Sequence, residues 1–470
     1  MTKTANNLAE EVGSSFSFTE WMTTHRHEGT IIWLFNIGAE EVWHAQPTGV
    51  ADPAENRIVN RMEDMVWLLS REQDVLIMRA EPSRLWQDYM RSLGFPGPRV
   101  LFPSGAAEDE DTPISELVLR DAALLERLSR IGTAANDTVF VPYAVTNREQ
   151  MIAAASGLRL IGGPAEASAV INDKVHSREL AARLGLRVTS GRICSSADEM
   201  MEAYYALRFE GYRKVVLKQP YNASGKGMFV ADSEDRFSAW VRRMERMAKR
   251  SGETRWLVEG WLEPREDWNA QLWIGPSGET ELFSVTRQLV NGTVYNGSEF
   301  ATAADEAELV GYHSSILRVG QELARLGYVG VAGIDSIRTE FGGWIPVVEI
   351  NGRFTLSTYI SFLSYRFPNR FLRTRYRRLP ADGTPGFDEL LDLLRREHLL
   401  YERETGEGII VYVSGTLPPA ATTRAPGRLF TISVASTRER ALGLENRLEA
   451  VLACFRNEAI SCTSSYDPEC

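Results

Sequence analysis

The sequence predicts a protein that combines α/β and α+β architecture in successive units. Between residues 29 and 164, short apolar runs alternate with helical segments, which is typical of a small parallel sheet covered by helices. From 165 to 384 strands and helices follow in mixed order and include a hairpin with a glycine turn. Residues 385–470 add two short strands and a helix, forming a small C-terminal α/β unit with a tail at 461–470. Residues 1–28 are polar and are expected to form a flexible tail.

Length and composition are ordinary for a globular protein. A chain of 470 residues is long enough for roughly two to four packed units. The net charge of −11 argues against a general nucleic-acid binder. The sequence shows neither a signal peptide nor an apolar stretch that could span a membrane. Four scattered cysteines without C-x-x-C spacing fit a reducing compartment, so we expect a cytoplasmic protein.

The first unit is predicted from three apolar runs. Residues 31–35 end at a polar turn and are expected to form a buried strand, and residues 74–78 and 138–141 repeat the pattern. The unit has no G-x-G-x-x-G fingerprint, so we do not expect it to hold a nucleotide. The glycine–glycine–proline sequence at 162–164 marks the boundary to the second unit. Further elements are expected as helices at 121–130, 175–184, 234–250, 308–326, 385–402 and 437–453, and as strands at 214–218, 255–259, 269–274, 408–413 and 428–434.

The hairpin around Gly342 carries the most informative polar residues. A turn centred on Gly342 places Asp335 directly opposite Glu349, and Asn351 lies on the same strand face as Glu349. Like charges opposite each other destabilise a sheet, whereas a divalent cation would make the arrangement attractive. Carboxylate and amide oxygens suit Mg²⁺. The alternative is an exposed polar hairpin without a ligand.

A second group of signals points to phosphate binding. Lys218 ends a predicted strand and precedes a glycine loop that contains Gly225, Lys226 and Gly227. Such a loop can present backbone N–H groups to phosphates, although the sequence is not a Walker A loop and a plain hairpin turn is the alternative. Lys174 stands at a helix start, where a positive charge is unfavourable unless it holds an anion or is simply solvated.

The segment after the next strand could contact the rest of a nucleotide. Glu259 is placed to accept a hydrogen bond from an adenine amino group, and the following backbone could contact the adenine edge. Glu266 or Asp267 could hold ribose hydroxyls. For each acid, an ordinary strand-end carboxylate is the alternative.

Taken in order, these motifs resemble those of the ATP-grasp superfamily between about residues 165 and 380. The resemblance implies a pre-ATP-grasp α/β domain at 29–164 and an ATP-grasp domain of two α+β subdomains that clasp ATP at 165–384. Gly333 stands where D-alanine ligases carry an arginine, so Arg353 or Arg287 would supply that charge. The layout most resembles the peptide ligases of the pheganomycin type, which act in antibiotic biosynthesis. The implied catalytic residues are Arg353, Lys226 and Arg287; the nucleotide-binding residues are Lys174, Lys218, Ser224, Gly225, Lys226, Gly227, Met228, Glu259, Trp261, Leu262 and Glu266; and the metal ligands are Asp335, Glu349 and Asn351.

The same resemblance implies an ATP-dependent carboxylate–amine ligase that forms an amide bond through an acyl phosphate and releases ADP and phosphate. ATP and Mg²⁺ are the expected cofactors, with two ions and with Mn²⁺ as an alternative metal. The expected partners are a small-molecule or peptide carboxylate donor and an amine acceptor, without nucleic acid or membrane, and a homodimer is left open. Two other functions remain: loading an amino acid onto a carrier-protein thiol, and non-catalytic ATP binding in a regulatory protein.

An arginine-rich run at 366–378 is the last feature with a predicted role. It contains no acid and interleaves aromatic residues with arginines, as a nucleic-acid patch would. Because the chain is acidic and the run follows the hairpin closely, we expect Arg373 and Arg377 to hold the anionic groups of the acceptor instead. A solvated helix face is the alternative.

Overall fold

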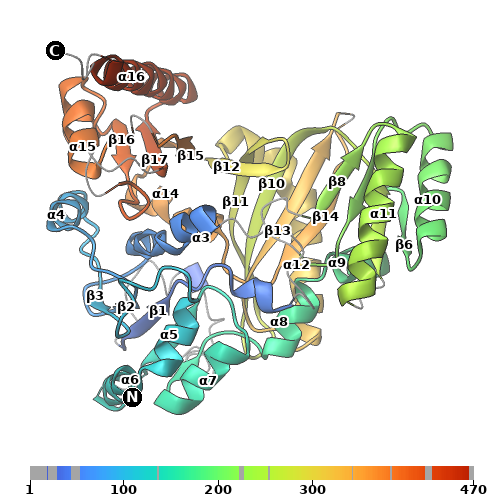
Figure 1. Ribbon diagram of the computed structural model, residues 1–470, viewed down its shortest axis with the longest axis horizontal. Coiled ribbons are helices and arrows are strands. Elements are labelled where there is room, and N and C mark those ends of the chain that lie inside the picture. Colours follow the sequence, from blue (N-terminus) through green and yellow to red (C-terminus); the bar gives the residue numbers. More distant parts are fainter. Residues whose placement is uncertain are drawn as a thin grey trace.

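The computed structural model describes residues 18–19, 29–43, 53–134, 137–221, 227–251, 255–340, 342–381, 384–418 and 426–464. Three sheets organise this part of the chain (Figure 1), and the predicted combination of α/β and α+β layers is confirmed. Most of the predicted tail lies outside the described residues. Phe18 is an exception to the predicted flexibility, because it is buried and stacks on Trp273 with ring centroids 4.7 Å apart.

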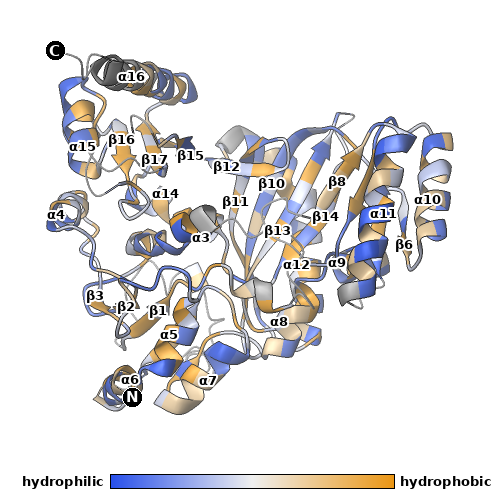
Figure 2. Ribbon diagram, in the orientation of Figure 1, coloured by the Kyte–Doolittle hydropathy of each residue, from blue (hydrophilic) through white to orange (hydrophobic). Residues whose placement is uncertain are grey.

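The N-terminal unit is built on a parallel sheet of order β3-β2-β1-β4-β5. The three central strands, β2, β1 and β4, are apolar and buried along their whole length because helices cover them, and Figure 2 shows hydrophobic colours along β1. Its elements are β1 (Ile31–Leu34), η1 (Ala39–Trp43), α3 (Pro53–Asn60), η2 (Glu63–Leu68), β2 (Val75–Ile77), α4 (Arg84–Ser92), β3 (Arg99–Leu101), α5 (Ile114–Arg120), α6 (Ala122–Ala134), β4 (Val139–Pro142), α7 (Asn147–Ser156), β5 (Arg159–Leu160) and α8 (Ala165–Ile171).

A four-stranded antiparallel sheet of order β6-β9-β7-β8 forms the second layer. Alternate residues of its strands, such as Val215, Leu217 and Val258, are buried against α10 and α11. The other residues of the same strands therefore face away from these two helices. The elements are β6 (Gly191–Cys194), α10 (Ala197–Phe209), β7 (Val215–Lys218), β8 (Met228–Ala231), α11 (Glu234–Ser251) and β9 (Trp256–Gly260).

The largest sheet has eight strands in the order β14-β13-β10-β11-β12-β15-β17-β16. One face packs on α12 through Trp268, Ala270 and Ile334, and α9 packs along the edge strand β14. The elements are α9 (Lys174–Arg183), β10 (Pro264–Ile274), β11 (Thr280–Asn291), β12 (Val294–Phe300), α12 (Ala303–Arg325), β13 (Gly330–Thr339), β14 (Trp344–Asn351), α13 (Leu356–Ile360), α14 (Leu363–Arg366), β15 (Phe371–Leu379), α15 (Phe387–Arg396), β16 (Gly408–Val411), β17 (Gly427–Ala435) and α16 (Arg438–Ser464).

The C-terminal strands are part of the large sheet rather than a sheet of their own. β15 pairs with both β12 and β17. The strands before β15 and the C-terminal strands are therefore hydrogen-bonded into one sheet. The same region shares its hydrophobic core with the N-terminal unit, in which Tyr89 packs on Phe387. Asp64 adds a polar link, because its carboxylate accepts hydrogen bonds from Ser414 N and Gly415 N at 2.7 and 2.9 Å. The predicted tail from residue 461 is wrong at its start, since α16 continues to Ser464.

Residues 371–378 of the arginine-rich run belong to strand β15. The acceptor role predicted for Arg373 and Arg377 is not supported. Arg373 is buried and pairs with Glu445 of α16 at 2.9 Å and with Glu299 of β12 at 2.5 Å. Arg377 pairs with Glu449 of α16 and donates to Thr431 Oγ1 at 3.0 Å. These two arginines therefore hold α16 onto the sheet.

This arrangement predicts a stability effect in place of a substrate effect. Arg373→Met should lower the free energy of unfolding by about 3–5 kcal/mol, because breaking a buried ion pair leaves its acids without compensation. Urea titration would measure the loss, and Arg396→Met, an exposed arginine on α15, is the control expected to change little. Unchanged stability together with a raised acceptor KM would restore the substrate role.

Candidate active site

The predicted hairpin forms, and the register of its two acids is confirmed. Asp335 on β13 pairs with Glu349 on β14. The register is not uniform, because Arg338 pairs with Trp344 near the turn and a bulge follows between Asp335 and Ile337. The bulge shifts the strands into the register that brings the two carboxylates together.

Three amide groups surround the Asp335 carboxylate on the sheet face opposite α12. Asn269 Nδ2 and Gln288 Nε2 each donate to Asp335 Oδ1 at 2.9 Å, and Asn351 Nδ2 donates to Oδ2 at 3.1 Å. Burial and the neighbouring Glu349 raise the pKa of Asp335 to about 6, against the lowering effect of the three amides. At neutral pH the side chain is therefore ionised, at a cost that a bound cation would offset.

Lys174 joins the hairpin to the four-stranded sheet. It begins α9, as predicted, and its Nζ donates to Glu349 Oε1 at 2.8 Å. Its backbone N–H donates to Pro220 O at 2.8 Å, just beyond β7. Asp173 caps the helix and binds Arg255 Nη2 at 2.7 Å, which compensates a lysine at an unfavourable helix position.

Lys218 and Glu259 lie together on the face of the four-stranded sheet that points away from α10 and α11. Their Nζ and Oε2 atoms are 2.6 Å apart, and the other oxygen of Glu259 pairs with Arg178 of α9. Both oxygens of Glu259 are thus engaged by cations. These contacts favour a role for Glu259 in holding Lys218 in place over a contact with an adenine amino group. Arg178 was not among the residues predicted from the sequence.

The segment after β9 and the glycine loop are described only in part. Trp261 N donates to Lys214 O at 2.9 Å, and Trp261 and Leu262 are half-buried. Gly227 has φ +80°, which favours glycine, and Met228 opens β8 opposite Lys218. The remaining loop residues named from the sequence, Ser224, Gly225 and Lys226, lie outside the described residues.

Glu266 and Arg287 do not lie with the other predicted site residues. Arg287 stacks over Trp268 at 4.8 Å and pairs with Glu266 at 3.3 Å and with Asp305 of α12 at 2.9 Å. Trp268 belongs to the core under α12, so this cluster occupies the face of the sheet opposite Asp335. The predictions that Glu266 holds ribose and that Arg287 acts in catalysis are therefore contradicted by strand alternation.

Asp267 has the orientation that Glu266 lacks. It lies on the same strand face as Asn269, and burial and nearby Asp335 raise its pKa to about 6. Of the two acids considered for this role in the sequence, Asp267 is the one on the side of the metal-ligand candidates.

Arg353 is held by the N-terminal unit. Its Nη1 donates to Tyr143 Oη at 3.0 Å and to Phe354 O at 3.1 Å, and its guanidinium lies 5.4 Å from the centre of the Tyr143 ring. Phe354 N donates in turn to Tyr143 O at 2.9 Å. Tyr143 follows β4, so the end of the parallel sheet fixes the arginine that follows the hairpin.

The chemistry of the hairpin residues fits a magnesium ion. Asp335 and Glu349 supply adjacent carboxylates, and Asn351 adds an amide oxygen. Lys174 is bound to Glu349, whereas Asp335 accepts from three neutral amides and keeps its full charge. Within the described part of the chain, no cluster of three or more His, Cys, Asp or Glu residues has a metal-binding arrangement, so a site here depends on the amide as well as the two acids.

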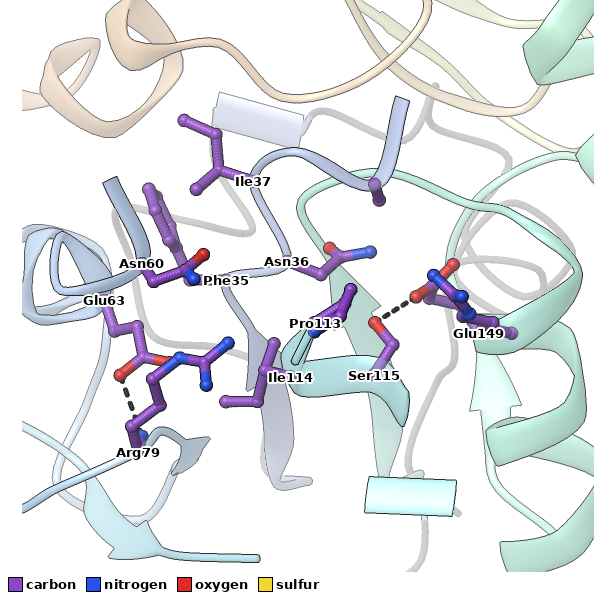
Figure 3. A pocket seen from close by; sticks show the side chains of 12 residues that line it. Phe35, Asn36, Ile37, Asn60, Glu63, Arg79, Pro113, Ile114, Ser115 and Glu149 are labelled. Carbon is purple, nitrogen blue, oxygen red and sulfur yellow. Dashed lines mark hydrogen bonds and ion pairs between the residues drawn. The ribbon is translucent and has the colours of Figure 1, made fainter. Parts of the chain in front are cut away.

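A small pocket lies at the carboxyl ends of β1 and β2 in the N-terminal unit (Figure 3). Glu63 accepts from Arg79 N at 2.8 Å, and its burial raises its pKa to about 8. The other dashed line in Figure 3 is the hydrogen bond from Ser115 Oγ to Glu149 Oε1. The space has room for little more than a water molecule, so it does not compete with the hairpin as a substrate site.

Comparison with known proteins agrees with this geometry. The fold resembles N5-carboxyaminoimidazole synthetase from Staphylococcus aureus, with TM-score 0.51 at 11% identity over 91% of this chain and 98% of that chain. It also resembles biotin carboxylase from Campylobacter jejuni, with TM-score 0.54 at 14% identity over 88% and 90%. Both likenesses show the fold. Residues 62–158 match the family described as Pre ATP-grasp domain, and residues 389–448 match the PGM1 C-terminal domain.

Two curated relatives narrow the class. The [butirosin acyl-carrier protein]–L-glutamate ligase of Niallia circulans is 31% identical over 349 residues, which is 73% of this chain and 77% of that protein. The L-propargylglycine–L-glutamate ligase of Streptantibioticus cattleyicolor is 24% identical over 373 residues, covering 72% and 76%. The chain belongs to the ATP-grasp carboxylate–amine ligases, in the family of the butirosin carrier-protein ligase. Among the described residues, no helix is both long and apolar enough to cross a membrane.

Proposed function

We propose that this ligase activates a carboxylate of L-glutamate with ATP and transfers the resulting acyl group to an amine. The observation that carries the proposal is a pair of buried lysines connected through α9. Lys174 Nζ, at the start of α9, donates to Glu349 Oε1 of the hairpin at 2.8 Å. Lys218 pairs with Glu259, which also binds Arg178 of α9. Both relatives are named for L-glutamate as a substrate.

The chain's own residues divide the work. Lys174 and Lys218 would neutralise the phosphates of ATP, and Asp335, Glu349 and Asn351 would hold Mg²⁺, for which we expect two ions with Mn²⁺ as a substitute. Bound there, the metal would supply positive charge beside the transferred phosphoryl group. Asp267 would face the nucleotide from the same sheet side, and Glu259 would keep Lys218 in position.

The proposed reaction has two steps. A carboxylate oxygen of the donor attacks the γ-phosphorus, the bond to the β-phosphate oxygen breaks, and ADP leaves. The acceptor nitrogen then attacks the acyl carbon, loses a proton, and the carbon–oxygen bond to phosphate breaks. Arg353 would stabilise the oxyanion between these two events. Water must be excluded because it would hydrolyse the acyl phosphate, a task for the glycine loop at 224–228.

A trapping experiment tests this function. Incubation with ATP, Mg²⁺, L-glutamate and hydroxylamine should give a glutamyl hydroxamate, ADP and phosphate, and D-glutamate and L-glutamine should give much less. Mass spectrometry and phosphorus NMR would identify the products. Release of AMP and pyrophosphate would point to an adenylate and contradict the mechanism.

A carrier-protein acceptor is the second candidate, because the relative at 31% identity is named for one. In that case glutamate-dependent ADP release would stay slow with free amino acids and rise on addition of a carrier protein that bears its phosphopantetheine arm. The hydroxamate assay would remain positive, since hydroxylamine intercepts the donor before the acceptor binds.

A further inference from the structure

Three buried residues, Thr358, Gln271 and Asn269, connect Thr355 in the loop after Arg353 to the carboxylate of Asp335. Thr355 N donates to Thr358 Oγ1 at 2.9 Å, and Thr358 Oγ1 donates to Gln271 Oε1 at 2.6 Å. Gln271 Nε2 donates to Asn269 Oδ1, and Asn269 Nδ2 donates to Asp335 Oδ1 at 2.9 Å. Gln271 and Asn269 are each 1% exposed and Thr358 is fully buried, so water does not substitute for any link.

The direction of every hydrogen bond in this chain follows from its last member. An ionised carboxylate can only accept, so Asn269 must turn its NH₂ group to Asp335 and its oxygen to the NH₂ group of Gln271. Gln271 therefore presents its oxygen to Thr358, whose hydroxyl donates to it and accepts from Thr355 N. A flipped amide at either position would place two oxygens or two NH₂ groups face to face in a buried site.

We propose that Thr358, Gln271 and Asn269 are positioning residues that hold the Asp335 carboxylate ready for a divalent cation. The inference rests on the proposed function, because it takes Asp335 as a metal ligand. These hydrogen bonds connect the Asp335 carboxylate to Thr355, two residues after Arg353, so one network holds both the loop of this arginine and the proposed metal ligand.

Thr358→Val removes the hydroxyl while keeping the shape of the side chain, and Thr358→Ser keeps the hydroxyl. The valine variant should bind Mn²⁺ with ADP about tenfold more weakly, within the range seen when partners of metal ligands are removed. Its Mg²⁺ requirement in turnover should rise, while kcat at saturating Mg²⁺ changes little. The serine variant should retain affinity close to that of the parent. Calorimetry and Mn²⁺ electron paramagnetic resonance give the binding readout without turnover.

Two further variants separate this effect from unfolding and from failure of the site. Thr416→Val loses a buried hydroxyl that donates to Arg428 O, far along the chain from Asp335, and should leave Mn²⁺ affinity unchanged. Gln271→Glu keeps its size but cannot donate to Asn269, so it should weaken Mn²⁺ binding more than Thr358→Val does.

Three results would refute the positioning network, and one of them would also refute the metal site. If Asp335→Asn abolishes Mn²⁺ binding but Thr358→Val and Gln271→Glu bind normally, the positioning network is refuted and the metal site stands. If Asp335→Asn itself binds Mn²⁺ normally, the proposed metal site is refuted and the network falls with it. A valine variant that loses affinity only in proportion to its loss of folded protein, measured by thermal unfolding, also refutes the network.

Discussion

Asp335→Asn is expected to reduce ligase turnover by more than about 100-fold while the protein stays folded. Changes to the outer partners of a metal typically cost 10–100-fold, so loss of a ligand itself should cost more. The substitution removes a negative charge that faces Glu349, and it puts a fourth NH₂ group among the amides of Asn269, Gln288 and Asn351. One of these amides must then turn away or lose its acceptor.

The measurement is ADP release at increasing Mg²⁺, with circular dichroism to verify the fold. Glu340→Gln is the matched control, because this exposed acid lies on the same hairpin near its turn. It should behave like the parent at every Mg²⁺ concentration. Near-normal turnover of Asp335→Asn at limiting Mg²⁺ would remove this residue from the metal site.

The parts of the site that could be predicted from the sequence are those set by local geometry. Strand alternation and turn position were enough to pair Asp335 with Glu349, although the true register depends on a bulge that the sequence did not reveal. Asn269 and Gln271, the two amides that connect to Asp335, alternate with apolar residues along β10, but they were not among the predicted site residues.

The wrong predictions came from two strands, one whose start was placed too late and one that was not predicted at all. β10 begins at Pro264, five residues before the predicted start, and alternation with Trp268 would have placed Glu266 on the α12 face. β15 was not predicted, and the acids that neutralise Arg373 come from Glu299 and Glu445, more than 70 residues away on either side. Ion pairs between distant elements leave no local pattern, so an arginine-rich strand looked like a binding surface.

The position of Arg353 was equally hidden, because its partner Tyr143 lies in another unit. Contact between the hairpin loop and the end of β4 would let the parallel sheet position Arg353 for the role proposed for it. This gives Arg353 a fixed orientation, which electrostatic stabilisation of a developing charge requires.

Arg353→Met should therefore lower kcat by about 100–1000-fold, the usual effect of removing one group that stabilises an oxyanion. The KM for ATP should change little, since the phosphates are assigned to Lys174 and Lys218. Arg353→Lys should recover only part of the rate, because an ammonium cannot stack on Tyr143 or donate in the planar geometry of a guanidinium. Steady-state kinetics with glutamate and hydroxylamine would measure both.

Tyr143→Phe refines the prediction, because it keeps the ring under the guanidinium but removes the oxygen that accepts from Arg353 Nη1. Its kcat should fall by a smaller factor than in Arg353→Met, and the effect should nearly vanish when Arg353 is already methionine, as expected for residues that act as a unit. If Arg353→Met retains the parental kcat but raises the KM for ATP, the arginine binds the nucleotide and the oxyanion must be stabilised elsewhere. If the two effects simply add, Tyr143 contributes to catalysis independently of Arg353.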